Sequence, residues 1–104
     1  MSTSPTEAAP RHEVEEIPDL DELADAFLAA RNRDELKRFL RDLCTLGELE
    51  ALAHRWQIVR LLDQGLPYLE IAERVHTSTA TVTRVAQWLR HGAGGYTLAL
   101  ERTR

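Results

Sequence analysis

The segment from Tyr68 to Arg90, YLEIAERVHTSTATVTRVAQWLR, constrains the fold of this chain more than any other. Its apolar positions recur at helical spacing in two short runs, which a polar turn separates. This spacing is typical of a helix-turn-helix, in which the second helix stands where it can enter a major groove of DNA. The buried faces predicted from the two runs consist of Ile71, Ala72 and Val75 in the first and Val82, Val85 and Leu89 in the second.

The turn between these two predicted helices carries signals of its own. Ser78 can accept a hydrogen bond from the free backbone N–H groups at the start of the second helix. His76 stands where many such turns have glycine, and a left-handed backbone strains most residues, although histidine is enriched there. The spacing alone leaves open a second interpretation, an ordinary helical hairpin in the core of a bundle.

The length of 104 residues suits one domain with a modest core. Residues 1–18 are rich in Ser, Thr, Pro and Glu, so we predict a disordered acidic N-terminal arm there. Residues 19–104 are predicted to form one helical domain for dimerisation and DNA binding, with the helix-turn-helix at 68–90. A first helix is expected from about Asp19 to Ala30.

Two capping-box signatures predict where the next helices begin. Asn32 is followed three residues later by Glu35, and Thr45 is followed at the same distance by Glu48. At this spacing the first side chain caps the helix while the glutamate reaches back to the preceding backbone. We therefore expect helices to begin just after Asn32 and just after Thr45.

The helix that begins after Thr45 should end before Gly65, which suits a left-handed stop. This helix has an apolar stripe along one side. The stripe is wider than one neighbouring helix would cover, because it also includes Ala53, Ile58 and Leu61. A helix that is apolar over more than one face usually lies at the centre of a bundle or in a dimer. We expect a homodimer whose core includes Leu49, Leu52, Trp56, Val59 and Leu62.

After the helix-turn-helix, residues 91–95 (HGAGG) should end the second helix, and we expect the tail to form a final helical turn or two on a partner.

The net charge of −4 is unusual for a DNA-binding protein, but its distribution matters more than its sum. Residues 1–25 hold eight acidic residues and only one basic residue, Arg11. Residues 77–90 hold Arg84 and Arg90 and no acidic residue. An acidic arm and a positive reading helix can coexist if they point apart, and the acidic run is most simply a solvated tail.

Signals for catalysis, metal binding and membrane insertion are missing from the sequence. The four histidines are scattered, Cys44 has no second cysteine to pair with, and no nucleophile or phosphate-loop motif is present. No run of about twenty apolar residues occurs, and the N-terminus lacks the basic-then-apolar pattern of a secretion signal. We therefore expect no enzyme, no cofactor, no metal and no membrane partner, and a cytoplasmic location.

The outward face of the second helix carries chemistry suited to DNA. With Val82, Val85 and Leu89 turned inward, a 100° projection turns small polar residues and one arginine outward. Arginine can fork onto guanine, glutamine can pair with adenine, and alanine or threonine methyls can contact thymine. Ser78 and the helix N-terminus suit a phosphate. The predicted DNA-binding residues are Ser78, Thr79, Ala80, Thr83, Arg84 and Gln87.

From Leu43 to Arg104 the chain resembles the Trp repressor superfamily, and most of all its YerC/YecD group of TrpR-related proteins. The resemblance is carried by ATVTR (80–84), ALAHRWQIVRLL (51–62) and HGAGGYTLAL (91–100). It implies an all-α, TrpR-like helical bundle with a helix-turn-helix, in which two chains intertwine as a homodimer and present two reading heads.

The resemblance also implies a possible effector pocket. Arg55 and Arg84 match the two arginines that Trp repressor places around its corepressor tryptophan, and Thr45 matches a hydroxyl residue near that pocket. Val85 and Trp88 stand where the repressor has glycine and serine, and their side chains should occupy much of the space that an indole needs. We therefore expect an effector, if there is one, to differ from tryptophan.

These observations favour a sequence-specific DNA-binding transcriptional regulator, a repressor, which binds a double-stranded operator through the helix from Ser78 to Arg90. The alternative is a helical dimerisation or adaptor module that docks on another protein. The two differ in their response to salt, because a DNA-binding protein loses affinity for duplex DNA steeply as the salt concentration rises.

Overall fold

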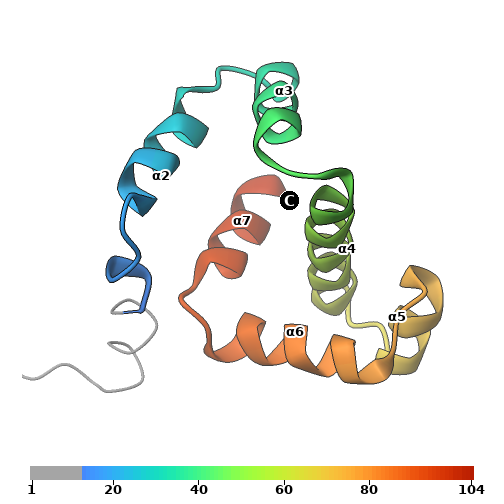
Figure 1. Cartoon of the computed structure of the whole chain (residues 1–104). Helices are drawn as coiled ribbons and strands as arrows, with labels where there is room; N and C mark the ends of the chain where they lie inside the picture. Colours follow the sequence, from blue (N-terminus) through green and yellow to red (C-terminus); the bar gives the residue numbers. More distant parts are fainter. Residues whose placement is uncertain (1–12) are drawn as a thin grey trace, which may run out of the picture. The chain divides into compact units, whose positions relative to one another are not determined.

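The computed structural model describes residues 13–104, and it is helical throughout, with no strand in that range (Figure 1). The expectation of an all-α fold is confirmed. Most of the predicted acidic arm, residues 1–12, lies outside the described residues. The helices are α2 (Leu20–Ala29), α3 (Arg33–Leu43), α4 (Leu46–Asp63), α5 (Tyr68–Val75), α6 (Thr79–His91) and α7 (Gly95–Thr103).

The chain divides into two compact units, Met1–Ala51 and Leu52–Arg104. The boundary between them falls inside α4, whose first residues belong to the first unit. The prediction of one domain over residues 19–104 stays a prediction. None of the helices formed by the described residues combines the length and hydropathy needed to cross a bilayer.

The helix starts in the first unit follow the predicted caps, with one variation. Asn32 Oδ1 accepts a hydrogen bond from the Glu35 backbone N–H at 2.9 Å, but the Glu35 carboxylate accepts from the Arg31 N–H instead of the Asn32 N–H. The second capping box is complete, since Thr45 Oγ1 accepts from the Glu48 N–H at 3.1 Å and the Glu48 carboxylate accepts from the Thr45 N–H at 2.8 Å. Local hydrogen bonding therefore fixes where α3 and α4 begin.

The first unit holds its helices together with few interior contacts. The rings of Phe27 in α2 and Phe39 in α3 meet edge to face, with centroids 5.6 Å apart. No residue of α2 or α3 is buried, and the side chain of Leu28 is 82% exposed. The apolar stripes of these helices are thus only partly covered within the described chain.

The second unit has a core of its own, to which all four of its helical segments contribute. Val59 of α4, Ile71 of α5 and Val82 of α6 are fully buried. The predicted inner faces of α5 and α6 are confirmed, with Leu89 half-buried at the end of the second. The buried hydrophobic residues are Ile58, Val59, Leu61, Ile71, Ala72, Val75, Val82, Val85, Ala86 and Leu100.

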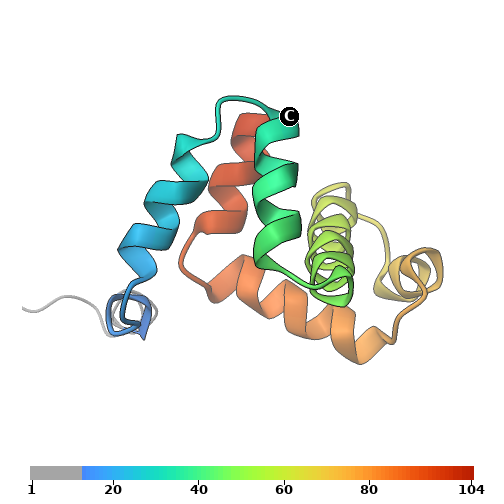
Figure 2. The same ribbon diagram turned by 45° about the horizontal axis from the view of Figure 1, so that its top comes forward.

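The C-terminal tail forms a longer helix than predicted, α7, which lies beside the second half of α4 (Figures 1 and 2). Tyr96 packs on Trp56 with ring centroids 6.3 Å apart, and the Arg104 guanidinium bonds the Asp63 carboxylate at 3.2 and 2.5 Å. These two contacts join the start of α7 to the middle of α4 and the residue after α7 to the last residue of α4. Buried Leu100 anchors it in the core of its own chain.

Left-handed residues end both α4 and α5. Gly65 has φ 85° after α4, as predicted, and His76 has φ 59° and ψ 52° after α5. Beyond each residue a backbone N–H reaches back to the helix: Leu66 N–H to Leu61 C=O at 3.3 Å, and Thr77 N–H to Ala72 C=O at 2.9 Å. This is the Schellman pattern of helix termination, which turns the chain sharply within two residues. At His76 it sets the angle at which α6 leaves α5.

Candidate nucleic-acid interface

The outer face of α6 is polar and exposed, as the helical projection predicts. Val82, Val85 and Ala86 face the core, and the residues on the opposite side of the helix are open to solvent. The predicted DNA-binding residues are all exposed: Ser78, Thr79, Ala80, Thr83, Arg84 and Gln87. The structure therefore brings these six side chains together at the N-terminal end and outer face of one helix.

A chain of hydrogen bonds runs along one flank of α6. Ser78 Oγ accepts from the Thr81 N–H at 3.1 Å, which confirms the predicted cap, and the two hydroxyl groups lie 3.1 Å apart. The Arg84 guanidinium donates to Thr81 Oγ1 at 3.3 Å. On the outer face, the Thr83 hydroxyl donates to the Thr79 carbonyl at 2.9 Å. Arg84 is thus directed along its own helix, while the Thr83 oxygen keeps acceptor capacity.

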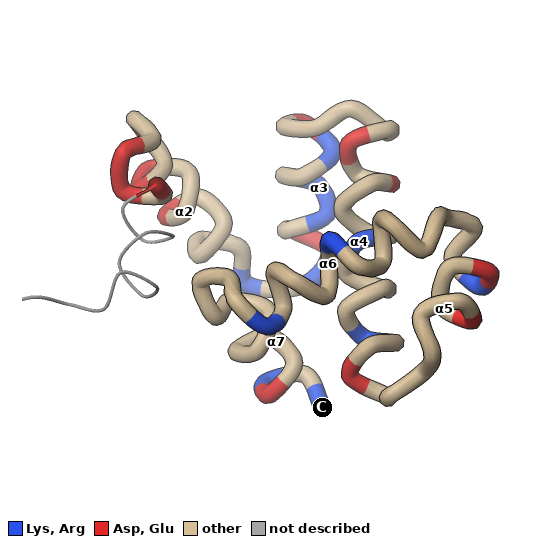
Figure 3. Tube along the Cα trace, turned by 90° about the horizontal axis from the view of Figure 1, so that it is seen from below, with Lys and Arg blue, Asp and Glu red and all other residues tan. Residues whose placement is uncertain are grey.

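The electrostatic character of α6 favours an anion. The helix contains no acidic residue, so no carboxylate on α6 lies next to its basic residues (Figure 3). The N-terminal backbone N–H groups of any α-helix lack intrahelical partners and carry partial positive charge. Ser78 satisfies one of these groups, and the others at this end remain open to a phosphate oxygen.

An open hollow of about 390 Å³ lies beside α6. It brings together four of the five residues predicted for an effector pocket, namely Arg55, Arg84, Val85 and Trp88. Thr81 and Tyr96 complete the lining. The fifth residue, Thr45, belongs to the other compact unit, so its part in this site stays a prediction.

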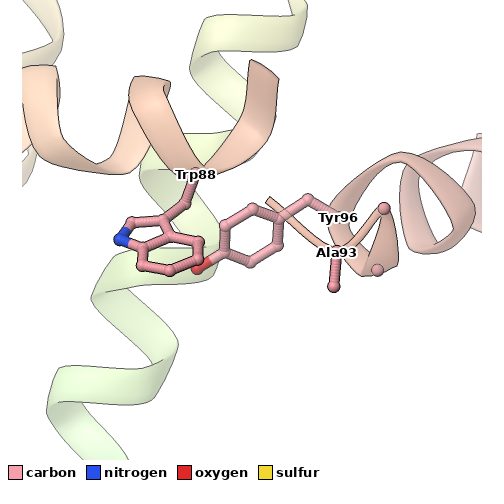
Figure 4. A pocket seen from close by; sticks show the side chains of 5 residues that line it. Trp88, Ala93 and Tyr96 are labelled. Atoms are coloured by element: carbon pink, nitrogen blue, oxygen red, sulfur yellow. The ribbon is translucent and has the colours of Figure 1, made fainter. Parts of the chain in front are cut away.

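Trp88 lies at the edge of this hollow and is 58% exposed. Its indole lies next to the ring of Tyr96, and Ala93 lies beyond that ring (Figure 4). The same two aromatic residues line a second hollow of about 340 Å³, together with Ala93, Gly94 and Gly95. The aromatic pair therefore forms a wall that the two hollows share.

Sequence reasoning missed three residues around α6. Ala86 is buried one turn after Val82, and the i, i+4 spacing was the signal that could have revealed it. Thr81 and Tyr96 line the hollow, but nothing local to Tyr96 shows that the tail folds back towards α6. Only the packing of α7 brings that residue to the site.

The residues predicted for a dimer core differ in how far their own chain buries them. Val59 is fully buried within the second unit, and Trp56 and Leu62 pack at the edge of its core. Leu52 is 47% exposed, and Leu49 of the first unit is half-buried. The central helix thus covers its Ile58–Leu61 side with its own chain and leaves other apolar side chains partly open.

Within residues 13–104, no three His, Cys, Asp or Glu side chains gather where they could hold a metal ion. The described chain is an all-helical protein with a tightly turned helix pair, whose second helix presents an exposed polar face free of acidic groups. It belongs to the Trp repressor family, whose model, described as Trp repressor protein, matches residues 18–104.

Individual relatives agree with this assignment. The uncharacterized protein YerC of Bacillus subtilis is 37% identical over 86 residues, which are 83% of each chain. A Trp operon repressor homolog of Haemophilus influenzae is 36% identical over 62 residues, 59% of this chain and 61% of that protein. The crystal structure of a TrpR-like protein from Eubacterium eligens superposes with a TM-score of 0.78 at 34% identity, covering 84% of this chain and 90% of that one. At the level of the family, these findings support a DNA-binding transcription regulator that dimerises, and they point away from an enzyme.

Proposed function

We propose that this protein is a sequence-specific transcriptional repressor that reads the major groove with the helix from Ser78 to Arg90. The observation that supports this proposal most directly is the exposed outer face of α6, opposite its buried valines. A helix that served only as packing would have little need for an outer face of this composition, because threonine is a poor helix former.

Each outer residue has a plausible partner on DNA. Arg84 can donate two hydrogen bonds to the O6 and N7 of guanine, and Gln87 can pair with the N6 and N7 of adenine. Thr83 can accept from a base or contact a thymine methyl, and Ala80 is small enough to let the helix approach closely. Arg84 would exchange its bond to Thr81 for the base contact, at little cost since the Arg84 side chain is exposed.

The N-terminal end of α6 would fix the position of the protein on the duplex. Ser78, Thr79 and the open backbone N–H groups can bind phosphate oxygens, which sets register without reading sequence. The other end of the helix carries Arg90, a second exposed cation. The operator contact thus combines phosphate binding at the start of α6 with base contacts along its outer face.

We further propose that the operator is bound by a homodimer. Its core would combine the central-helix residues named above with the uncovered stripes of α2 and α3. Two copies of α6 would then read half-sites about one turn of DNA apart, as in other helix-turn-helix dimers.

The role of the hollow beside α6 follows from its lining. Val85 and Trp88 present bulky side chains to it, so we propose that DNA binding is independent of tryptophan. Calorimetry with tryptophan should show no binding to the wild type. The double variant Trp88→Ser with Val85→Gly removes the indole and the isopropyl group and should open a space that accepts an indole. Micromolar affinity of the wild type for tryptophan would contradict the proposal.

The decisive experiment is the selection of bound duplexes from a random pool, followed by binding measurements at rising salt. We expect a defined sequence with two related half-sites, and an affinity that falls steeply with salt concentration. Repeating the selection with each amino acid added would reveal an effector. A protein that enriches no sequence and shows no salt-dependent binding to duplex DNA would instead support the adaptor alternative.

A further inference from the structure

A third hollow, which we call the arginine groove, lies in the second unit where α4 to α7 meet. It measures about 530 Å³ and shares no lining residue with the hollow beside Trp88. Most of the groove lining has no role in the proposed binding of DNA. Its lining includes Leu62, Leu66, Tyr68, Leu89, Arg90 and Leu100.

The walls of the arginine groove are mainly apolar. Leu62, Leu66 and Leu89 are half-buried at the edge of the core, and Leu100 is almost fully buried behind them. Apolar side chains left partly open in a hollow gain free energy when an apolar group displaces water from them. The body of any molecule bound here should therefore be aliphatic or aromatic.

One positive charge at this groove has no carboxylate partner among the described residues. The Arg90 guanidinium donates to the Tyr68 hydroxyl at 2.8 Å, and Arg90 forms no ion pair within residues 13–104. The other arginine in the lining, Arg104, is bound to Asp63, whose hydrogen bond and charge raise the pKa of Arg104. Arg104 is thus already neutralised, and Arg90 remains to attract an anion.

We propose that the arginine groove binds a small organic carboxylate with an apolar body. The carboxylate would accept hydrogen bonds from the Arg90 guanidinium and from the Tyr68 hydroxyl, whose proton is available because its oxygen accepts from Arg90. The apolar body would lie against Leu66 and Leu89. The volume falls in the range of small-molecule sites, and a few polar groups at one end of an apolar hollow are typical of them.

A carboxylate in the groove would contact both helices of the helix pair. Arg90 lies near the end of α6 and Tyr68 begins α5, so the carboxylate would bridge the helix pair at the end away from its turn. Carboxylate binding here does not depend on DNA binding, so the experiment needs no operator.

The test is a titration of the full chain with sodium octanoate and with phenylpropionate, followed by two-dimensional amide NMR. We expect saturable shifts centred on Leu66, Leu89 and Leu100, with affinity in the millimolar range or better. Octanamide, which has the same chain and no charge, should bind at least tenfold more weakly, because it forms no charge-assisted hydrogen bond.

Three variants make the assignment specific. Arg90→Gln should weaken octanoate binding by roughly tenfold or more, and Thr97→Trp should abolish it by filling the groove from exposed α7. Arg102→Gln removes a charge from the same helix outside the lining and should leave the affinity unchanged. The proposal is overturned if no saturable shifts occur, if they centre on Arg55 and Thr81, or if Arg90→Gln binds as tightly as the wild type.

Discussion

The two compact units carry equally clear helical patterns but use their apolar residues differently. In residues 52–104 the inner faces of all the helices meet in one core, with Ile71 and Val82 fully buried. In residues 13–51 no side chain of α2 or α3 is fully buried: their apolar residues are half-buried or exposed, and Leu43 and Leu46 are about half exposed. An amphipathic pattern thus predicts that a helix forms, but the pattern does not tell which other surface packs against the apolar face of that helix.

This contrast fits the proposed homodimer. A set of helices that buries no residue contributes little hydrophobic free energy on its own. Contiguous exposed apolar surface on a small protein commonly marks an interaction site. We therefore expect the second unit to keep its structure through its own core, and the first unit to depend on a second copy of the chain.

The largest expected effect concerns the core of the second unit. Ile71→Ala should lower the free energy of unfolding by ~2–5 kcal/mol, because it leaves a cavity where the side chain has no exposed surface. Denaturant unfolding monitored by circular dichroism measures the change. Leu69→Ala, on the same helix but 64% exposed, is the control and should change stability by less than ~0.5 kcal/mol. Equal losses in both variants would contradict the described core.

The next effect tests whether a second copy of the chain covers the apolar side chains of the first unit. Leu43→Glu should weaken the dimer by ~2–4 kcal/mol, because it places a charge in an interface built from apolar side chains. Sedimentation equilibrium at several protein concentrations measures this. Leu69→Glu adds the same charge at an exposed leucine of the second unit, and it should leave dimerisation unchanged. A wild type that sediments as a stable monomer at micromolar concentration would refute the dimer itself.

A third prediction places function on the unit with its own core. Arg84→Ala should cost ~1–3 kcal/mol of operator affinity and relax the preference at one base position, if the arginine forks onto a guanine. Binding to a panel of single-base operator variants measures both effects. Arg102→Ala, an exposed arginine of α7, should have little effect on base preference. Uniform weakening over the whole panel would make Arg84 a phosphate contact instead.

The smallest effect compares the helix caps of the two units. Ser78→Ala should cost ~1 kcal/mol of global stability, because α6 folds together with the core. Asn32→Ala removes a similar cap from α3, which buries no residue. At concentrations too low for dimers, this second change should raise amide exchange within α3 and leave global stability nearly unchanged. A matching global loss in both variants would mean that the units fold as one.

The sequence predicted those features of the fold that depend on near neighbours. The Ser78 cap, the box of Thr45 with Glu48 and the left-handed stop at Gly65 all involve residues within a few positions of one another. Their hydrogen bonds are short-range, so spacing alone identifies them. The outer face of α6 was predictable for the same reason, since its orientation follows from helical geometry once the inner face is known.

Features set by packing between distant segments could not be predicted in this way. The length of α7 and its contact with α4 depend on Tyr96 reaching Trp56 and on Leu100 entering the core. The bond between Arg90 and Tyr68 joins residues 22 positions apart. The lining of the hollow beside Trp88 depends on the same fold-back, which is why sequence reasoning found the two arginines by resemblance but missed Tyr96.

The shared wall formed by Trp88 has an optical consequence. The chain has two tryptophans, of which Trp56 is half-buried against Tyr96 and Trp88 is mostly exposed. Fluorescence from Trp88 should therefore be red-shifted and open to collisional quenching, whereas that of Trp56 should be shielded. Because Trp88 borders two hollows and stands on the proposed reading helix, its emission can report a molecule that enters either hollow without any attached dye. A Trp56→Phe variant would isolate that signal and make the protein its own sensor.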